Sequence, residues 1–380
     1  MYKNLRRMLA AALLLSACGY GWAAPVGARP SPAASDAKEM TPKAALRLPL
    51  RVAFVYVSPV GNAGWSYQHD LGRLAMERSL GTQVHSTVVE SVSEGPDAER
   101  VFRDLAARGN HLIFATSFGY QEAALKVAQD HPGVVLEHTG GYKVAPNFNT
   151  YNARFYEGRY LAGLVAGKMS QTGVAGYVAG FPIPEVVQGI NAFALGMRAV
   201  NPKAQVKVVW LNTWFDPPKE REAALSLLNL GVDTLTYHCG STAIPLLAEE
   251  KGVKLLGYQS DLRHVAPSAQ LTSVVHDWGG YYTEVAKAVI AGTWAPRPFW
   301  GGVRQRVVRL APFSPQVPSA LRYQVTEVER AMAAGRFHPF AGKLTDNEGK
   351  VRQVQGTMRD EDIALMDFLV DGVVGKLPVR

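Results

Sequence analysis

The sequence has few of the residues and runs that mark several common protein classes. Its 380 residues include only two cysteines, Cys18 and Cys239. If Cys18 is acylated or removed, no internal disulfide can form. No apolar run reaches the roughly 20 residues that a transmembrane helix needs. Charged residues make up 19% and hydrophobic residues 47%, which excludes wholesale disorder and permits large cores, and the length predicts two domains.

Motifs that carry familiar enzyme chemistry are also missing. The sequence contains no nucleophile elbow, no Gly-Lys-Ser phosphate loop and no His-Glu-x-x-His metal motif. His276-Asp277 and His238-Cys239 are pairs of adjacent residues, whose side chains point apart along a strand. We therefore expect neither an enzyme nor a metal or cofactor site, and an active site assembled from distant residues stays open as the alternative.

Positive charge is present without being concentrated. The formal net charge is +8, and it falls to +5 when Lys3, Arg6 and Arg7 are removed with a leader segment. Nucleic-acid-binding proteins usually show a clustered basic stripe, and the remaining basic residues form no long run. We expect a solvated surface and no nucleic-acid partner.

The first residues predict export and a lipid anchor. Lys3, Arg6 and Arg7 precede a short apolar core, and the segment ends in Leu15-Ser16-Ala17-Cys18, a sequence similar to the bacterial lipobox. We expect a signal peptide at 1–17, lipidation of Cys18 and an anchor and tether at 18–48, which is rich in Pro, Ala and Ser. The protein would then be held at a membrane of the periplasm or cell envelope. The alternative is an ordinary signal peptide cleaved near Ala24.

From residue 49 onward, short β-branched runs alternate with helical patterns. One series extends from the strand expected at Arg51–Val57 to that at Val134–Glu137, and a second begins after Tyr151-Asn152 and reaches the strand at Leu271–Val275. Strands and helices that alternate at this spacing predict βαβ units and parallel sheets. Two such series predict two similar α/β lobes, which bind ligands beyond the carboxyl ends of their strands.

The loops expected after the strands share an unusual composition. Most of them combine an aromatic residue, a glycine and a small polar residue, in both series. Glycine permits close approach of the backbone, helix N-termini offer free N–H groups, and aromatic faces stack on flat rings. One such loop would indicate little, but their recurrence in both halves predicts a binding cleft between the lobes.

Several short motifs follow one another in order between about Arg51 and Val374. They are Gly64-Trp65-Ser66, Glu157-Gly158-Arg159-Tyr160-Leu161-Ala162-Gly163, Gly180-Phe181-Pro182-Ile183-Pro184, Trp214-Phe215-Asp216-Pro217, Gly257-Tyr258-Gln259-Ser260-Asp261 and Phe337-His338-Pro339-Phe340. In these motifs the sequence resembles the basic membrane protein family of ABC-transporter substrate-binding proteins, which includes purine-nucleoside-binding lipoproteins.

This resemblance implies the type I periplasmic-binding-protein fold, in which two doubly wound parallel-sheet lobes are joined by three crossovers and close on ligand. We expect the first lobe at 49–151 plus about 276–312, and the second at 152–275 plus about 313–380. The candidate hinges lie near Tyr151-Asn152, Val275–Asp277 and Ala311–Ser314. An ABC permease is the implied partner, and a membrane sensor that uses the same fold is the alternative.

The resemblance also implies that Trp65 and Trp214 occupy the two positions that stack on a purine, although either could be a core anchor. In nucleoside-binding members an acidic residue and a lysine contact the ribose, and here Gln259 and approximately His276 stand in their places. We therefore expect a free base, adenine first, with a nucleoside as the alternative. The other candidate ligand-binding residues are Asn62, Ser66, Phe118, Gly119, Phe181, Phe215 and Asp261, the last of which could equally cap the segment that follows.

Overall fold

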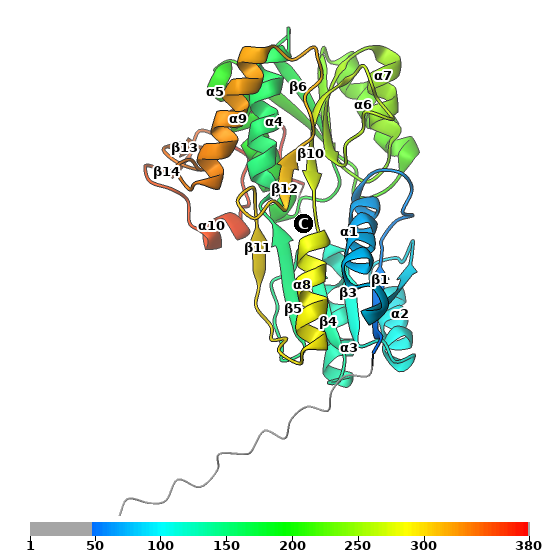
Figure 1. The fold of residues 1–380 in the computed structure, drawn as a ribbon. Helices are drawn as coiled ribbons and strands as arrows, with labels where there is room; N and C mark the ends of the chain where they lie inside the picture. Colours follow the sequence, from blue (N-terminus) through cyan, green and yellow to red (C-terminus); the bar gives the residue numbers. More distant parts are fainter. Residues whose placement is uncertain (1–47, 379–380) are drawn as a thin grey trace, which may run out of the picture. The chain divides into compact units, whose positions relative to one another are not determined.

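A computed structural model describes residues 48–378, in which two parallel sheets form separate lobes (Figure 1). The first sheet has the strand order β11-β5-β4-β3-β1-β2, and all of its neighbours pair in parallel. We call this sheet and its helices the first lobe. Its strands are β1 (Leu50–Val55), β2 (Val84–Val89), β3 (Leu112–Ala115), β4 (Val135–Thr139), β5 (Phe148–Ala153) and β11 (Phe299–Gly301). Its helices are α1 (Trp65–Leu80), α2 (Pro96–Ala107), α3 (Gln121–Asp130) and α8 (Gly279–Ile290), with 3-10 turns at Gly81–Gln83 and Phe118–Tyr120.

The second sheet has the order β12-β10-β9-β8-β6-β7-β15 and is parallel except for the edge pair of β10 with β12. With its helices it forms the second lobe. Its strands are β6 (Val174–Ala179), β7 (Gln205–Trp210), β8 (Thr234–His238), β9 (Lys254–Gln259), β10 (Gln270–His276), β12 (Val308–Leu310) and β15 (Val373–Val374). The other elements are α4 (Phe155–Met169), α5 (Pro184–Val200), α6 (Pro217–Asn229), α7 (Ala243–Lys251), α9 (Ser319–Ala333), α10 (Asp360–Ala364) and the separate strand pair β13 (Leu344–Thr345) and β14 (Val351–Gln353).

The alternation of side chains along the strands explains why helices cover both faces of the first sheet. On β1, Phe54 belongs to the core that includes Met76 of α1, whereas its neighbour Val55 belongs to the core that includes Phe102 of α2. Successive side chains of a strand point to opposite faces, so a strand that is apolar throughout needs cover on both. The apolar runs that predicted buried strands are therefore confirmed as the centre of the fold.

The chain crosses between the lobes three times, as predicted. It passes from β5 into α4, from β10 into α8, and from β11 to β12. The third crossing lies between Gly301 and Val308, which is earlier than the hinge expected at Ala311–Ser314, because β12 already pairs with β10 of the second lobe. The same pairing places Val308–Leu310 in the second sheet, although the expected boundary near 312 assigns it to the first lobe. The lobe boundaries themselves stay predictions.

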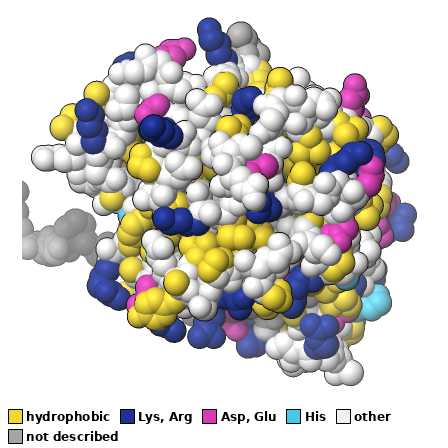
Figure 2. Space-filling model, turned by 90° about the horizontal axis from the view of Figure 1, so that it is seen from above, with side chains coloured by type: hydrophobic (Ala, Val, Ile, Leu, Met, Phe, Trp, Pro, Cys, Tyr) yellow, Lys and Arg dark blue, Asp and Glu magenta, His cyan; other side chains and the backbone are white. Residues whose placement is uncertain are grey.

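Surface charge is spread over the face shown in Figure 2. Lys and Arg side chains occur across this face, with acidic, hydrophobic and neutral side chains between them. Among residues 48–378, no helix combines the length and the apolar character that crossing a membrane requires. The predicted signal peptide, Cys18 and the tether lie outside the residues that the structure describes.

Candidate functional site

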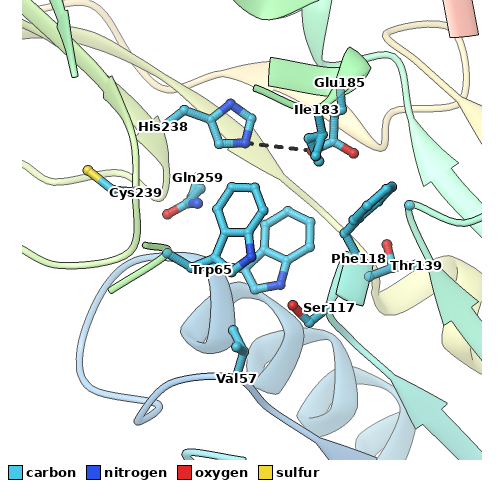
Figure 3. Close-up of a pocket in the computed structure, with 12 residues that line it drawn as sticks. Val57, Trp65, Ser117, Phe118, Thr139, Ile183, Glu185, His238, Cys239 and Gln259 are labelled. Atoms are coloured by element: carbon cyan, nitrogen blue, oxygen red, sulfur yellow. Dashed lines mark ion pairs between the residues drawn. The ribbon is translucent and has the colours of Figure 1, made fainter. Parts of the chain in front are cut away.

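A cavity lies between the two lobes, beyond the carboxyl ends of strands from both sheets. It encloses about 450 Å³, including the part that opens to solvent. Figure 3 shows that the labelled side chains surround a common space. The apolar part of the wall comes from Val57, Trp65, Phe118, Ile183, Trp214 and Cys239. The polar part comes from Ser117, Thr139, Glu185, His238 and Gln259, and Gly140 completes it.

Trp65 is the first residue of α1 and belongs to the first lobe. Its indole Nε1 donates a hydrogen bond to the backbone carbonyl of Thr116 at 2.6 Å. The ring also packs edge-on against His69, with centroids 4.5 Å apart, and against Phe155 at 5.9 Å. The hydrogen bond and these ring contacts fix the orientation of the indole before any ligand arrives.

Trp214 reaches the same cavity from the second lobe. It lies in the loop between β7 and α6. Asp216 caps the start of α6, because its side chain accepts a hydrogen bond from the backbone N–H of Lys219. The indole packs edge-on against Phe181 at 4.8 Å. Its Nε1 donates to Glu94 of the first lobe at 3.3 Å, so this contact joins the two lobes beside the cavity.

Glu94 organises the wall of the first lobe behind this contact. Its Oε1 accepts hydrogen bonds from the Ser117 hydroxyl at 2.6 Å and from the backbone N–H of Gly119 at 2.9 Å. A Cβ at Gly119 would lie 2.3 Å from the Glu94 carboxyl carbon, so only glycine leaves room for the carboxylate. One carboxylate oxygen therefore positions both Trp214 and the loop that follows β3.

Several polar groups at the cavity have no hydrogen-bond partner among the described residues. They are Thr139 Oγ1, His238 Nδ1 and Gln259 Oε1, all of which are buried. Buried polar atoms are normally paired, so each of these groups is available to a ligand. The cavity thus offers flat apolar faces together with unpaired hydrogen-bonding groups.

Glu185 and His238 lie next to each other in the cavity wall (Figure 3). Glu185 Oε2 accepts from the side-chain amide of Asn152 at 2.9 Å, and Oε1 lies 3.6 Å from His238 Nε2. Burial lowers the pKa of His238, and the contact with Glu185 opposes that shift only in part. His238 is therefore neutral near pH 7, and the imidazole can donate from one nitrogen and accept at the other.

Gln259 is held in an unusual backbone conformation at the end of β9. Its φ is 70°, a left-handed value that is uncommon for residues other than glycine. Its backbone carbonyl accepts a hydrogen bond from the Gln68 side chain of α1 at 2.7 Å. The Gln259 side chain is 3% exposed and lines the cavity, so the first lobe helps to hold this residue of the second lobe in place.

Contacts near the cavity show that the lobes lie together. The backbone N–H of Gly64, in the first lobe, donates to Ser260 Oγ of the second lobe at 2.9 Å. Gly64 has a φ of 94°, and a Cβ there would lie 2.3 Å from the backbone oxygen of Gly240. This approach requires glycine at position 64 and identifies the structure as a closed arrangement.

The structure brings some of the predicted site residues together and places the others elsewhere. Trp65, Phe118, Trp214 and Gln259 line the cavity, and Gly119 and Phe181 line a larger space beside it. The remaining candidates, which line neither space, are Asn62, Ser66, Phe215, Asp261 and His276.

Local contacts account for the positions of these remaining candidates. The Ser66 hydroxyl bonds with that of Ser58 at 2.7 Å, and the Asp261 carboxylate pairs with Arg263. The His276 ring lies against Phe155 with centroids 4.2 Å apart, inside the core. Asn62 is exposed, and the Phe215 side chain is partly exposed. Their roles in binding stay predictions.

Other cavity residues were not singled out from the sequence. Ser117, Thr139, Ile183, His238 and Cys239 lie in the strand-end loops or strand ends where a cleft was predicted, so the pattern located their loops without ranking them. Burial raises the pKa of the Cys239 thiol, which is consistent with an unreactive wall residue. Among the described residues, no group of His, Cys, Asp and Glu could hold a metal ion.

Several known proteins are similar to this chain in sequence. Residues 50–334 match the model of a family described as ABC transporter substrate-binding protein, PnrA-like. A purine-binding protein of Brucella abortus (strain 2308) is 46% identical over 330 residues, which cover 87% of this chain and 94% of that protein. A protein of Haloferax volcanii, provisionally named an ABC transporter glucose-binding protein, is 37% identical over 329 residues, 87% of this chain and 81% of that one.

A solved structure that shares little sequence identity with this chain has the same fold. The ABC transporter solute-binding protein from Aeropyrum pernix K1 superposes with a TM-score of 0.66 at 17% identity, over 83% of this chain and 97% of that one. This likeness confirms the predicted type I periplasmic-binding-protein fold.

Proposed function

Because the chain belongs to the PnrA-like family of ABC transporter substrate-binding proteins, we propose that it binds a purine base, adenine first, between its lobes. It would deliver this base to the permease of an ABC importer. Substrate-binding proteins of such importers work outside the cytoplasm, and we propose lipidation of Cys18 as the means by which this one is held at the membrane.

The observation that carries the proposal is the chemistry of the cavity wall. Trp65 and Trp214 come from opposite lobes, and Phe118 adds a third aromatic ring to the same cavity. Stacking of a base on an aromatic side chain contributes about 1–3 kcal/mol, and it suits any flat ring. The unpaired atoms of Thr139, His238 and Gln259 supply what the edge of a purine needs, because such an edge carries both donors and acceptors.

The residues near the expected ribose position favour a free base over a nucleoside. Gln259 provides an amide where nucleoside-binding members of the family have a carboxylate, and it therefore offers a weaker acceptor to sugar hydroxyls. His276 is 2% exposed and packs on Phe155. Burial lowers the pKa of His276 well below its usual range, so it supplies no cation in the place of the family's lysine.

Calorimetric titration with four solutes tests the proposal directly. The panel is adenine, hypoxanthine, adenosine and glucose, the last chosen because a relative carries a glucose-binding name. We expect adenine to bind with one ligand per chain, and more tightly than adenosine. Tight binding of glucose with no response to the purines would overturn the purine assignment, and preference for adenosine would overturn the choice of the free base. Turnover of a bound purine would favour the enzyme alternative.

A further inference from the structure

A second, larger space adjoins the cavity between the lobes. It encloses about 2000 Å³, including its opening to solvent. Five residues line both spaces, namely Phe118, Gly140, Ile183, Glu185 and Trp214, so the two spaces share a wall. We call the second space the vestibule. The vestibule therefore lies directly beside the cavity, on the other side of these shared side chains.

The wall of the vestibule is mainly apolar and comes from segments far apart in the sequence. Phe181 precedes α5, Phe299 and Trp300 belong to β11, and Tyr142 and Leu365 lie at exposed positions. The exposed fractions are 73% for Tyr142 and 75% for Leu365, so both side chains are open to solvent where they line the vestibule. Phe299 is held rigidly because its ring stacks on Tyr281 with centroids 4.8 Å apart.

Several polar groups of the vestibule already have partners within the protein. Glu94 accepts from Ser117, Gly119 and Trp214, while Glu185 accepts from Asn152. The side-chain amide of Gln188 donates to the backbone carbonyl of Ile363 at 2.7 Å. Unpaired buried atoms among the lining residues are Thr150 Oγ1 and Trp300 Nε1. The vestibule therefore offers much apolar surface and few free polar groups.

From this geometry we propose that the vestibule is a subsite for an apolar substituent on the bound base, so that the protein also takes purines that carry an alkyl or aryl group. The inference rests on the proposed function and names a wider substrate class for the same site. Burial of apolar surface contributes roughly 25 cal/mol per Å², so an aliphatic or aromatic group gains free energy by entering the vestibule. The hydroxyls and ring oxygen of a ribose gain little from this apolar wall, because they find few hydrogen-bond partners on it.

Titration of adenine, N6-benzyladenine and adenosine into the wild-type protein tests the subsite. We expect N6-benzyladenine to bind at least as tightly as adenine, because the base keeps its cavity and the benzyl group reaches the vestibule. Adenosine is expected to bind at least about tenfold more weakly than N6-benzyladenine, which corresponds to about 1.4 kcal/mol.

Two matched variants locate the effect. Leu365→Asp places a charge on the vestibule wall. It is expected to weaken the binding of N6-benzyladenine about three- to tenfold and to leave the affinity for adenine within about twofold of the wild type. Leu246→Asp alters another exposed leucine, on α7, which lines neither space, and is expected to leave the binding of both ligands unchanged. Thermal melting checks that both variants are folded.

The outcomes separate the two proposals. If adenine binds and N6-benzyladenine binds a hundredfold more weakly, or if Leu365→Asp affects both purines equally, the subsite is refuted and the purine assignment stands. If neither purine binds, the assignment of a purine site fails, and the vestibule inference fails with it.

Discussion

Replacing Trp214 by alanine is expected to weaken adenine binding while the protein stays folded. The indole lies in a loop, is only partly buried and packs on Phe181 and Glu94 near the cavity. Loss of one stacking face costs about 1–3 kcal/mol, which raises the Kd about 5- to 150-fold. Trp214→Phe keeps a ring without the N–H group, so it is expected to recover most of the affinity.

Trp65→Ala should differ from Trp214→Ala in a measurable way. Trp65 contacts His69 and Phe155 and bonds to the Thr116 carbonyl, so its truncation removes core packing as well as a stacking face. Because Trp65 is only partly buried, its loss of stability should lie below the roughly 3–5 kcal/mol that is typical when a fully buried core aromatic is truncated to alanine. We expect Trp65→Ala to lower both affinity and Tm, whereas Trp214→Ala lowers mainly affinity.

Calorimetry with adenine and thermal melting of each variant separate the two effects. Trp210→Ala is the matched control, because this partly buried tryptophan ends β7 and lines neither space. We expect the control to change Tm without changing affinity. The reasoning is refuted if Trp214→Ala binds adenine like the wild type, or if it unfolds as readily as Trp65→Ala.

Three further predictions follow from the closed arrangement, from a buried carboxyl group and from the N-terminal sequence. Gly64→Ala is expected to weaken adenine binding at least about tenfold, because its Cβ would lie 2.3 Å from the backbone oxygen of Gly240. Calorimetry measures this affinity, and an unchanged value would contradict the role of the contact. Burial raises the pKa of Glu137 from 4.5 to about 7. The free energy of unfolding should therefore fall by up to about 3 kcal/mol as the pH rises between these two values, because the carboxyl group ionises first in the unfolded chain. Denaturant titrations at several pH values should show this fall for the wild type and not for Glu137→Gln. Metabolic labelling with a fatty acid should mark the wild type and leave Cys18→Ser unlabelled, and an unlabelled wild type would refute the anchor.

The sequence predicted the fold well where local patterns are strong. Apolar runs such as Val174–Ala179 form strands, and the helix expected at Pro184–Val200 begins and ends at these residues. β5 and β11 were not predicted as strands, since Phe148–Ala153 contains polar residues and Phe299–Gly301 is too short to show a period. Their pairing is decided by the sheet into which they insert, which no local window reveals.

The site was predicted at the level of loops more than of individual residues. Trp65 and Trp214 line the cavity, and two signals located them, their place after predicted strands and their match to the aromatic positions of the family. Glu94 gave no such signal, because its importance depends on where three donors from distant segments meet. His276 ends a strand, and the packing of several aromatic rings around it, Phe155 and Tyr258 among them, places its ring in the core.

The most direct test of the central claim is to identify the ligand that the protein carries from the cell. The protein would be purified without added solutes and then denatured, and the released small molecules would be analysed by mass spectrometry. The account predicts a free purine base, adenine or a purine with an apolar substituent, at close to one molecule per chain. Release of a sugar, or of a nucleoside with no free base, would contradict it.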